Sequence, residues 1–332
     1  DGTFGQYVPA VPVVPGNSTF FLSGLVHNLY YRTNIRLANM GDESTIAMIQ
    51  VLDQDGGQLG ETMWVRVEAQ STRQINRIAE FVGLPTFLDI FSVRVDTGSE
   101  KSGAWASVID NITGDPVLYG PMTLDEETSS LWVPGIAHLM GENNSRWRTD
   151  ISFFNTSGAP LSADVAYFPS EDEGFLATQT LHNIQPGTAR YYVDILPNEF
   201  LPGWIDSSKG YFVISGVGDS KSPHVAARTY NLDGATGGTF GQNLVAFQAK
   251  DLILEGSEGY IPGVTMSADS ETGFRTNLGL LNTNTQGWSQ VRVSVFDEDG
   301  NLAGEAEIWL EPGQFIQPNL ADRLGIGFKD RW

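Results

Sequence analysis

Short apolar stretches with the two-residue alternation of β-strands recur along the whole chain. The clearest three stand at matching places in three similar parts of the sequence, at residues 46–52, 163–168 and 291–296. Alternation of this kind buries one face of a strand and leaves the other face in water. The pattern therefore predicts half-buried β-strands at equivalent positions in three parts of the chain.

Each of these strands runs into an acidic turn that contains glycine, at residues 53–57, 170–174 and 297–301. Glycine adopts the positive φ that tight turns require, so an acidic Gly-containing turn between two alternating runs favours a hairpin. We expect the return strands at residues 61–67, 177–184 and 305–310. A short helical segment is expected after a second turn, with its N-caps at Asn76, Asp194 and Asn319.

A nine-residue motif marks the strand that precedes each hairpin. It reads YRTNIRLAN at residues 31–39, WRTDISFFN at 147–155 and FRTNLGLLN at 274–282, so the copies start 116 and 127 residues apart. Periods of that length exceed a solenoid repeat and suit one small domain each. The chain is therefore predicted to be an array of similar modules.

The repeat also predicts the fold class. About six or seven short strands in each copy, punctuated by Gly and Pro, are typical of an antiparallel β-sandwich. We expect an all-β chain of tandem immunoglobulin-like β-sandwich modules, two complete and one incomplete. The expected modules are residues 15–123, 130–248 and 257–332.

The ends of the chain are out of phase with this repeat. The sequence GTFGQ at residues 2–6 repeats at 238–242, where it closes the second module. Residues 1–14 are thus predicted to be the closing strand of a module, whereas the third module stops two strands early. Either the chain is a fragment of a longer array, or residues 1–14 complete the third module of the next subunit and build a linear polymer. The donor side chains would be Thr3, Phe4, Tyr7, Val8, Val11 and Val13, although the donated segment is one strand short.

Three sequence motifs resemble a known repeat. They are Trp-Arg-Thr-Asp at 147–150, Ala-Arg-Thr-Tyr-Asn with Gly-Thr-Phe-Gly-Gln at 227–242, and Ala-Ser-Val-Ile-Asp-Asn-Ile-Thr-Gly-Asp-Pro at 106–116. They are similar to repeats in uncharacterised secreted and surface proteins of bacteria. The resemblance implies an extracellular bacterial setting and a modular β fold, but it implies no activity and no catalytic residues.

Composition narrows the possible partners. The 19 basic and 40 acidic residues give a net charge of −21, which disfavours binding to nucleic acids and anionic lipids. The absence of cysteine excludes disulfides, thiol nucleophiles and zinc–thiolate sites. No run of 18 apolar residues predicts a membrane span.

The recurring polar residues are predicted to be scaffold rather than a ligand site, because duplicated modules share their scaffolding. The arginines would pin the sandwich ends and the asparagines would form turns. These residues are Arg32, Asn39, Arg148, Asn155, Arg275 and Asn282. The acidic turns could hold structural Ca²⁺, but ordinary hairpin turns are the preferred interpretation, and no cofactor is expected.

The sequence otherwise gives little evidence of a catalytic, phosphate-binding or metal site. The four histidines are scattered, no Gly-x-Ser-x-Gly elbow or phosphate loop is present, and no carboxylate pair stands out. We expect Trp64 and Trp309 to pack in cores or between modules, with a sugar-stacking platform as the alternative.

The combined prediction is a non-enzymatic, extracellular structural protein of the bacterial surface. Its expected partner is itself, in a head-to-tail filament, or the neighbouring modules of a longer chain. The alternative is a fragment of a surface adhesin whose modules bind carbohydrate or another protein. An enzyme ranks third.

Overall fold

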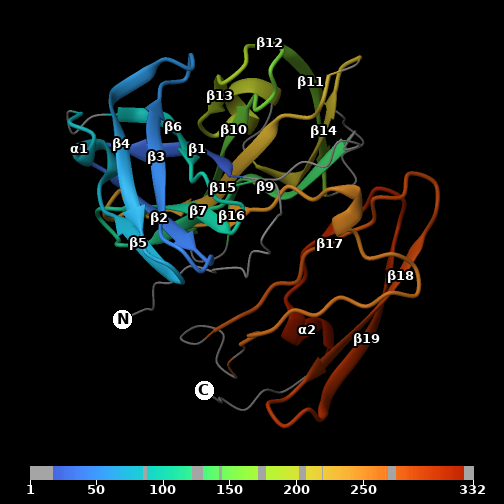
Figure 1. Ribbon diagram of the computed structural model, residues 1–332. Helices are drawn as coiled ribbons and strands as arrows, with labels where there is room; N and C mark the ends of the chain where they lie inside the picture. The colour runs from blue at the N-terminus through green and yellow to red at the C-terminus, as the bar shows by residue number, and fades with distance from the viewer. Residues whose placement is uncertain are drawn as a thin grey trace. The chain divides into compact units, whose positions relative to one another are not determined.

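The computed structural model describes residues 18–84, 88–121, 130–141, 144–170, 177–201, 207–218, 220–265, 267 and 274–324. The predicted donor residues lie outside this part of the chain: Thr3, Phe4, Tyr7, Val8, Val11 and Val13. The structure consists mostly of antiparallel β-strands (Figure 1), which confirms the predicted all-β fold. The described helices have at most five residues, and none of them has the length of a membrane span.

The chain forms two compact units. Unit 1 comprises Asp1–Phe168 and Leu176–Ala249, and unit 2 comprises Pro169–Phe175 and Lys250–Trp332. Unit 1 holds two β-sandwiches.

The first sandwich consists of two four-stranded sheets, with strand orders β1-β6-β3-β4 and β5-β2-β7-β8. Its elements are β1 (Thr19–His27), β2 (Tyr31–Asn39), β3 (Thr45–Leu52), β4 (Gln58–Val67), β5 (Ser71–Ile75), α1 (Ile78–Phe81), β6 (Leu88–Asp96), β7 (Ser102–Asp110) and β8 (Pro116–Tyr119).

The second sandwich repeats this order, with eight added to every strand label. One layer runs β9-β14-β11-β12 and the other β13-β10-β15-β16, and the β9–β10 pairing joins them at a corner. Its elements are β9 (Ser130–Met140), β10 (Arg146–Phe154), β11 (Leu161–Pro169), β12 (Ala177–Ile184), β13 (Ala189–Tyr192), the π-helical turn η2 (Leu196–Phe200), β14 (Ser208–Gly216), β15 (His224–Leu232) and β16 (Thr239–Leu244). The 3₁₀ turn η3 (Ala249–Asp251) follows.

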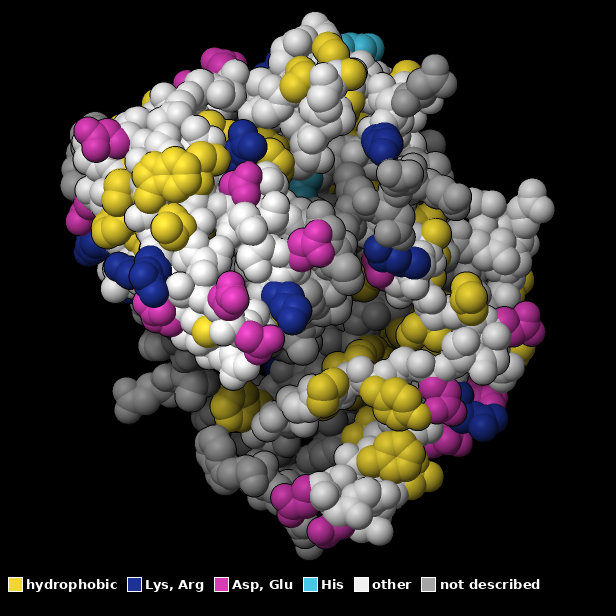
Figure 2. All heavy atoms as spheres, in the orientation of Figure 1, with side chains coloured by type: hydrophobic (Ala, Val, Ile, Leu, Met, Phe, Trp, Pro, Cys, Tyr) yellow, Lys and Arg dark blue, Asp and Glu magenta, His cyan; other side chains and the backbone are white. Residues whose placement is uncertain are grey.

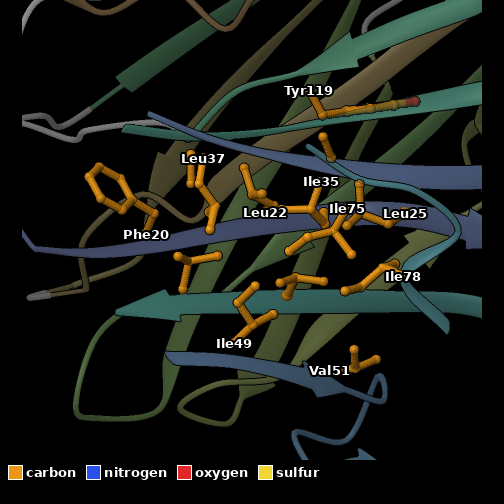
Figure 3. Close-up of a cluster of buried hydrophobic side chains, with 14 of the residues drawn as sticks. Phe20, Leu22, Leu25, Ile35, Leu37, Ile49, Val51, Ile75, Ile78 and Tyr119 are labelled. Carbon is orange, nitrogen blue, oxygen red and sulfur yellow. The ribbon is translucent and has the colours of Figure 1, made fainter. Parts of the chain in front are cut away.

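The core of the first sandwich lies between its two sheets. Figure 3 shows Leu22 and Ile49 from one sheet meeting Ile35 and Ile75 from the other, and all four are at most 3% exposed. Full burial of such a side chain contributes roughly 1.5–3 kcal/mol. The strand alternation predicted from sequence therefore supplies the contacts that hold the two layers together. A second cluster, centred on Phe153, fills the other sandwich in the same way.

Unit 2 contains a hairpin and a small second sheet. The hairpin pairs β18 (Ser289–Phe296) with β19 (Leu302–Leu310), and the second sheet pairs β17 (Leu280–Leu281) with β20 (Phe315–Ile316). Helix α2 (Leu320–Leu324) follows β20. The buried apolar side chains of unit 2 are Ile308, Leu310, Phe315 and Leu320. These elements correspond in order to β2–β5 and α1 of the first sandwich.

Only one of the three predicted helix N-caps is correct. Asn319 accepts a hydrogen bond from the N–H of Ala321 at 2.9 Å, as an N-cap should. Asn76 and Asp194 are not N-caps: the residue before α1 is Arg77 and the residue before η2 is Ile195, and neither helix has a side-chain cap. A residue with positive φ enters each segment instead, Arg77 (52°) and Asp194 (45°).

Candidate functional site

The last asparagine of the repeated motif has the same buried position in all three copies. Asn39, Asn155 and Asn282 are at most 4% exposed. The side-chain amide of Asn155 donates to the carbonyls of Ala159 and Ile184, both at 2.8 Å, and its Oδ1 accepts the N–H of Ser157. Asn39 and Asn282 bind the corresponding loops in the same manner. Each asparagine therefore ties a strand end to the two turns beside it.

Two further motif positions make repeated contacts that sequence reasoning overlooked. The threonine hydroxyl donates to a carbonyl in the strand or segment before the motif, from Thr33 to Val26, from Thr149 to Ala137 and from Thr276 to Thr265. The next residue holds the entry to the helical segment in the two sandwiches. Asn34 Oδ1 accepts the N–H of Arg77 at 3.0 Å, and Asp150 Oδ1 accepts that of Asp194 at 2.9 Å. This contact explains why neither segment has an N-cap of its own.

The motif arginines do not share one partner. Arg32 donates to the side chain of Asn111 at 2.7 Å, whereas the Nε of Arg148 lies 3.1 Å from Asp194 Oδ2. Arg275 is exposed. Because the partners differ, recurrence of the arginine does not reflect one repeated interaction.

A buried polar cluster lies where the two sandwiches of unit 1 meet. We call it the joint: Tyr31, Asp110, Thr113, Asp115, Arg228, Thr239 and Gly241. Asp110 and Asp115 flank the turn between β7 and β8, and Thr239 and Gly241 lie on β16 of the second sandwich. Strands β16 and β8 also contact each other.

The carboxylates of the first sandwich bind the backbone of β16. Asp110 Oδ2 accepts both the N–H and the hydroxyl of Thr239, each at 2.8 Å. Asp115 Oδ2 accepts the N–H of Gly241 at 2.8 Å, and the hydroxyl of Thr113 donates to the Thr239 carbonyl at 2.8 Å. Asp110 and Asp115 are 2% and 6% exposed. Charge-assisted bonds to buried N–H groups are among the stronger protein hydrogen bonds, so this contact fixes the register of β16 against the turn.

Arg228 completes the joint from the second sandwich. It is 5% exposed, and its guanidinium donates to Thr239 Oγ1 at 2.6 Å. The guanidinium carbon lies 5.4 Å from the ring centroid of Tyr31 and 4.9 Å from that of Tyr230, within cation–π range. The Tyr31 hydroxyl lies 3.2 Å from Thr239 Oγ1. Because the threonine proton is directed at Asp110, Tyr31 is the donor of that bond.

Gly241 is needed for this close approach. A Cβ atom at Gly241 would lie 2.8 Å from the Arg228 Nε and 2.8 Å from the Thr229 carbonyl oxygen, closer than packing allows. Glycine at the third position of Thr-Phe-Gly is therefore part of the contact, together with the threonine.

A third carboxylate, Asp150, lies next to the joint through its bond to Tyr230. Asp150 accepts hydrogen bonds from the hydroxyls of Tyr191 and Tyr230, both at 3.2 Å. Burial raises the pKa of the Asp150 carboxyl, while the Asp194 N–H, Arg228 and the two tyrosines oppose the shift. Burial likewise raises the pKa of Asp115, against the lowering effect of Gly241 and Arg228. Asp194 itself bonds His138 at 2.8 Å and Arg148, so the polar groups here are used in binding one another.

Apolar contacts continue the interface between the sandwiches. The Phe21 and Phe154 rings lie 5.3 Å apart. Gly24, with a φ of 71°, lies so close to Ser152 and Ala226 that an added Cβ would be 3.3 and 3.4 Å from their Cβ atoms. Such packing favours a fixed contact between the two sandwiches rather than a loose tether.

His224 makes this interface sensitive to acid. It is fully buried beside the Ser23 hydroxyl, 3.2 Å from Nδ1, and burial lowers its pKa from 6.5 to about 4. A lowered histidine pKa stabilises the fold above pH 6.5, and this contribution is lost as the pH falls towards 4.

We expect acidification from pH 7.5 to 5 to remove roughly 2 kcal/mol of unit 1 stability through His224. The unfolding free energy at both pH values, from urea titration followed by circular dichroism, measures this loss. A His224→Asn variant should lose about 2 kcal/mol less than the wild type over the same interval. Equal pH dependence of the two proteins would contradict the assignment, since the raised pKa values of Asp115 and Asp150 affect both alike.

The acidic turns form hairpins. Asp53 Oδ1 accepts the N–H groups of Asp55 and Gly57, and Asp297 Oδ1 accepts those of Asp299 and Asn301. These carboxylates thus act as turn formers, as the preferred interpretation holds. In the described parts of the chain, no group of three or more His, Asp or Glu side chains is arranged to hold a metal ion. Residues 171–174 of the second predicted turn lie outside those parts.

Trp64 and Trp309 do not lie in a core. They are 66% and 57% exposed, so the prediction of core packing is wrong for both. Each lies on the outward face of a hairpin, because its neighbours Val65 and Ile308 point inward and are buried. Figure 2 shows hydrophobic side chains on the surface over β3–β4 and over β18–β19. A comparison with known protein families and with curated proteins gave no match to this chain.

Proposed function

We propose that the chain is a structural, non-enzymatic protein of the bacterial cell surface, built of tandem immunoglobulin-like β-sandwich modules. The modules are residues 15–123, 130–248 and 257–332, with residues 1–14 as one further closing strand. The observation that carries this proposal is the joint, in which one sandwich binds the closing strand β16 of the next. Its buried polar groups bind backbone and one another, which suits rigid stacking better than the conversion of a substrate.

The N-terminal segment is proposed to act as a closing strand of the same kind. Aligning GTFGQ at residues 2–6 with 238–242 makes Thr3 the counterpart of Thr239 and Gly5 the counterpart of Gly241. These are the two residues whose N–H groups Asp110 and Asp115 accept. Phe4, Tyr7, Val8, Val11 and Val13 then correspond to positions along β16 and the segment after it.

Unit 2 offers an edge that could receive such a strand. The sequence Tyr-Ile-Pro-Gly-Val at 260–264 matches Trp-Val-Pro-Gly-Ile at 132–136 of β9, and Gly135 and Gly263 share a positive φ. Val133 is fully buried in β9, whereas its counterpart Ile261 is 67% exposed and lies outside any strand. An apolar segment left in water is stabilised when another strand covers it.

The pairing of β9 with the segment after β16 gives the proposed assembly its register. Trp132 and Phe247 exchange two backbone hydrogen bonds, at 3.0 and 2.8 Å. By the same alignment, Val11 of one chain would pair with Tyr260 of the next. Repeating this head-to-tail contact produces a filament, because the contact does not close on itself.

The alternative is that neighbouring modules of a longer surface protein supply the missing strands. Strand β16 pairs along its whole length with β15. Within the residues of unit 2 that the structure describes, nothing corresponds to β15 or β14. A single donated strand would therefore rely mainly on the segment at residues 260–264.

Cysteine cross-linking tests the proposed register. The chain has no cysteine, so a Val11→Cys chain mixed with a Tyr260→Cys chain can form only the intended heterodimer or symmetric by-products. Paired strand residues lie about 5.5 Å apart at Cα, within disulfide range. We expect a heterodimer band on a non-reducing gel after mild oxidation.

A Trp288→Cys chain is the matched control for that experiment and should not cross-link to Val11→Cys. Light scattering of the wild-type chain should show masses that grow with concentration, and deletion of residues 1–14 should abolish this growth. A monodisperse monomer that the deletion leaves unchanged, without a heterodimer band, would overturn strand donation.

A further inference from the structure

The outer face of the β18–β19 hairpin carries two exposed indoles. Trp309 on β19 is 57% exposed and pairs across the hairpin with Gln290 of β18. Trp288, 60% exposed, stands two residues before Gln290 and thus in phase with the same face. The inward side chains Ile308 and Leu310 are buried, so the indoles are surface groups and do not belong to the small core of unit 2.

Hydrogen-bonding groups continue this face beside the indoles. Gln290 Nε2 donates to Glu307 at 2.9 Å, and Arg292 donates to the other oxygen of Glu307 at 3.3 Å. Ser294 donates to Glu305 at 2.8 Å. The row is exposed, so its amide, guanidinium and carboxylate groups keep free donor and acceptor capacity toward a ligand. Figure 2 shows charged side chains beside hydrophobic ones in this region.

We propose that this face is a binding site for neutral polysaccharide chains. A sugar ring presents an apolar C–H face that stacks on a flat indole, and a rim of hydroxyls that bond to amide, guanidinium and carboxylate groups. A strand hairpin holds its side chains in a flat row, which suits an extended chain better than a compact ligand. The proposal goes beyond a structural role and does not depend on filament formation.

The charge of this face and of the whole chain favours neutral glycans over polyanionic ones. The face carries Arg292 against Glu305 and Glu307, and the whole chain has a net charge of −21. Polyanionic glycans would be repelled by this charge. The centres of protein interfaces are depleted in charged side chains. A protein partner is therefore disfavoured here, because Glu307 of β19 lies on this face and bonds to side chains of β18.

The equivalent faces of the two sandwiches of unit 1 lack this combination. On β3–β4, Trp64 is a single exposed indole that pairs with Met48, and Ile46, Thr62 and Arg66 share its face. On β11–β12, the outward pair is Asp164 with Thr180, and no indole is present. Within the described residues, only the hairpin of unit 2 combines two exposed indoles with a row of charged and amide groups. Trp64 is therefore a matched control.

Titration calorimetry on the full chain tests the site, with cellohexaose, maltohexaose and chitohexaose as separate probes. We expect saturable binding of at least one probe and none of polygalacturonate. Trp309→Ala and Trp288→Ala should each weaken that binding at least tenfold, whereas Trp64→Ala should leave it unchanged. Arg292→Ala should weaken it less, since hydroxyl contacts at an exposed site exchange with water.

Absence of binding to all three probes would overturn the proposal. So would equal loss of binding on Trp64→Ala, which would indicate a nonspecific effect of exposed indoles. A third outcome also counts against it: if Trp309→Ala changes the molar mass in light scattering but not glycan binding, the face contacts protein. The readouts remain separate, since the deletion of residues 1–14 tests assembly and should not alter glycan binding.

Discussion

Replacing Asp110 with alanine should uncouple the two sandwiches of unit 1. The carboxylate makes two bonds to Thr239 across the joint and accepts the N–H groups of Ile112 and Thr113 within its own turn. Its removal leaves the buried N–H and hydroxyl of Thr239 without their acceptor. A hydrogen bond to a charged group contributes about 1.5–3 kcal/mol, so losing these bonds should destabilise unit 1 strongly.

Scanning calorimetry measures this effect. We expect the wild-type unit 1 to melt in one transition, and the Asp110→Ala variant to melt earlier and in two transitions. Asp233→Ala is a matched control, because Asp233 forms a similar turn through exposed bonds to Ala235 and Thr236. The control should change the melting temperature little. An Asp110→Ala protein that melts as the wild type does would mean that the joint does not couple the sandwiches.

Replacing Asn155 with alanine should destabilise the second sandwich by about 3–4 kcal/mol. The side chain is fully buried, and alanine would remove the donor to the Ile184 carbonyl and the acceptor of the Ser157 N–H, while the Ala159 carbonyl keeps the Ser157 hydroxyl. Each unsatisfied buried group costs about 1–3 kcal/mol, and part of that cost is relieved by local rearrangement. Urea unfolding followed by tryptophan fluorescence measures the loss.

Asn198→Ala serves as the control for that prediction. Asn198 also donates to a backbone carbonyl, that of Val193, but it is exposed to water. We expect a loss of less than about 1 kcal/mol there, because water replaces the bond. Similar losses for the two variants would show that the buried asparagine is not a special support. Asn282→Ala should act on unit 2 alone and leave the unfolding of unit 1 unchanged.

The strands and hairpins were predictable because they depend on local alternation and turn residues. Residues 46–52, 163–168 and 291–296 all lie in strands, and the turns at Asp53 and Asp297 close hairpins as expected. The helix N-caps were not predictable at Asn76 and Asp194. There the residue that enters the helical segment is held by Asn34 or Asp150, which are 43 and 44 residues away in sequence from the N–H groups that they accept.

The sequence contains the motifs that form the joint, but it did not predict their contact. Asp110, Arg228 and Thr239 belong to the motifs that resemble repeats of bacterial surface proteins, but no local sequence pattern shows that these motifs contact each other. Their contact depends on how two whole sandwiches pack. Trp309 was misassigned for a related reason: an indole in an apolar strand suggests burial, and only the register against Gln290 shows which face it occupies.

The residues of the joint are far apart in sequence, and this separation determines when the contact can form during folding. Asp110 and the strand that it binds are 129 residues apart. The first sandwich is complete once β8 has formed, whereas Thr239 becomes available only near the end of the second. Until then, the turn between β7 and β8 offers its carboxylates to any Thr-Phe-Gly segment within reach, and contacts of such separation form slowly. A chain whose growth pauses between β8 and β16 is therefore exposed to domain-swapped pairing with another copy.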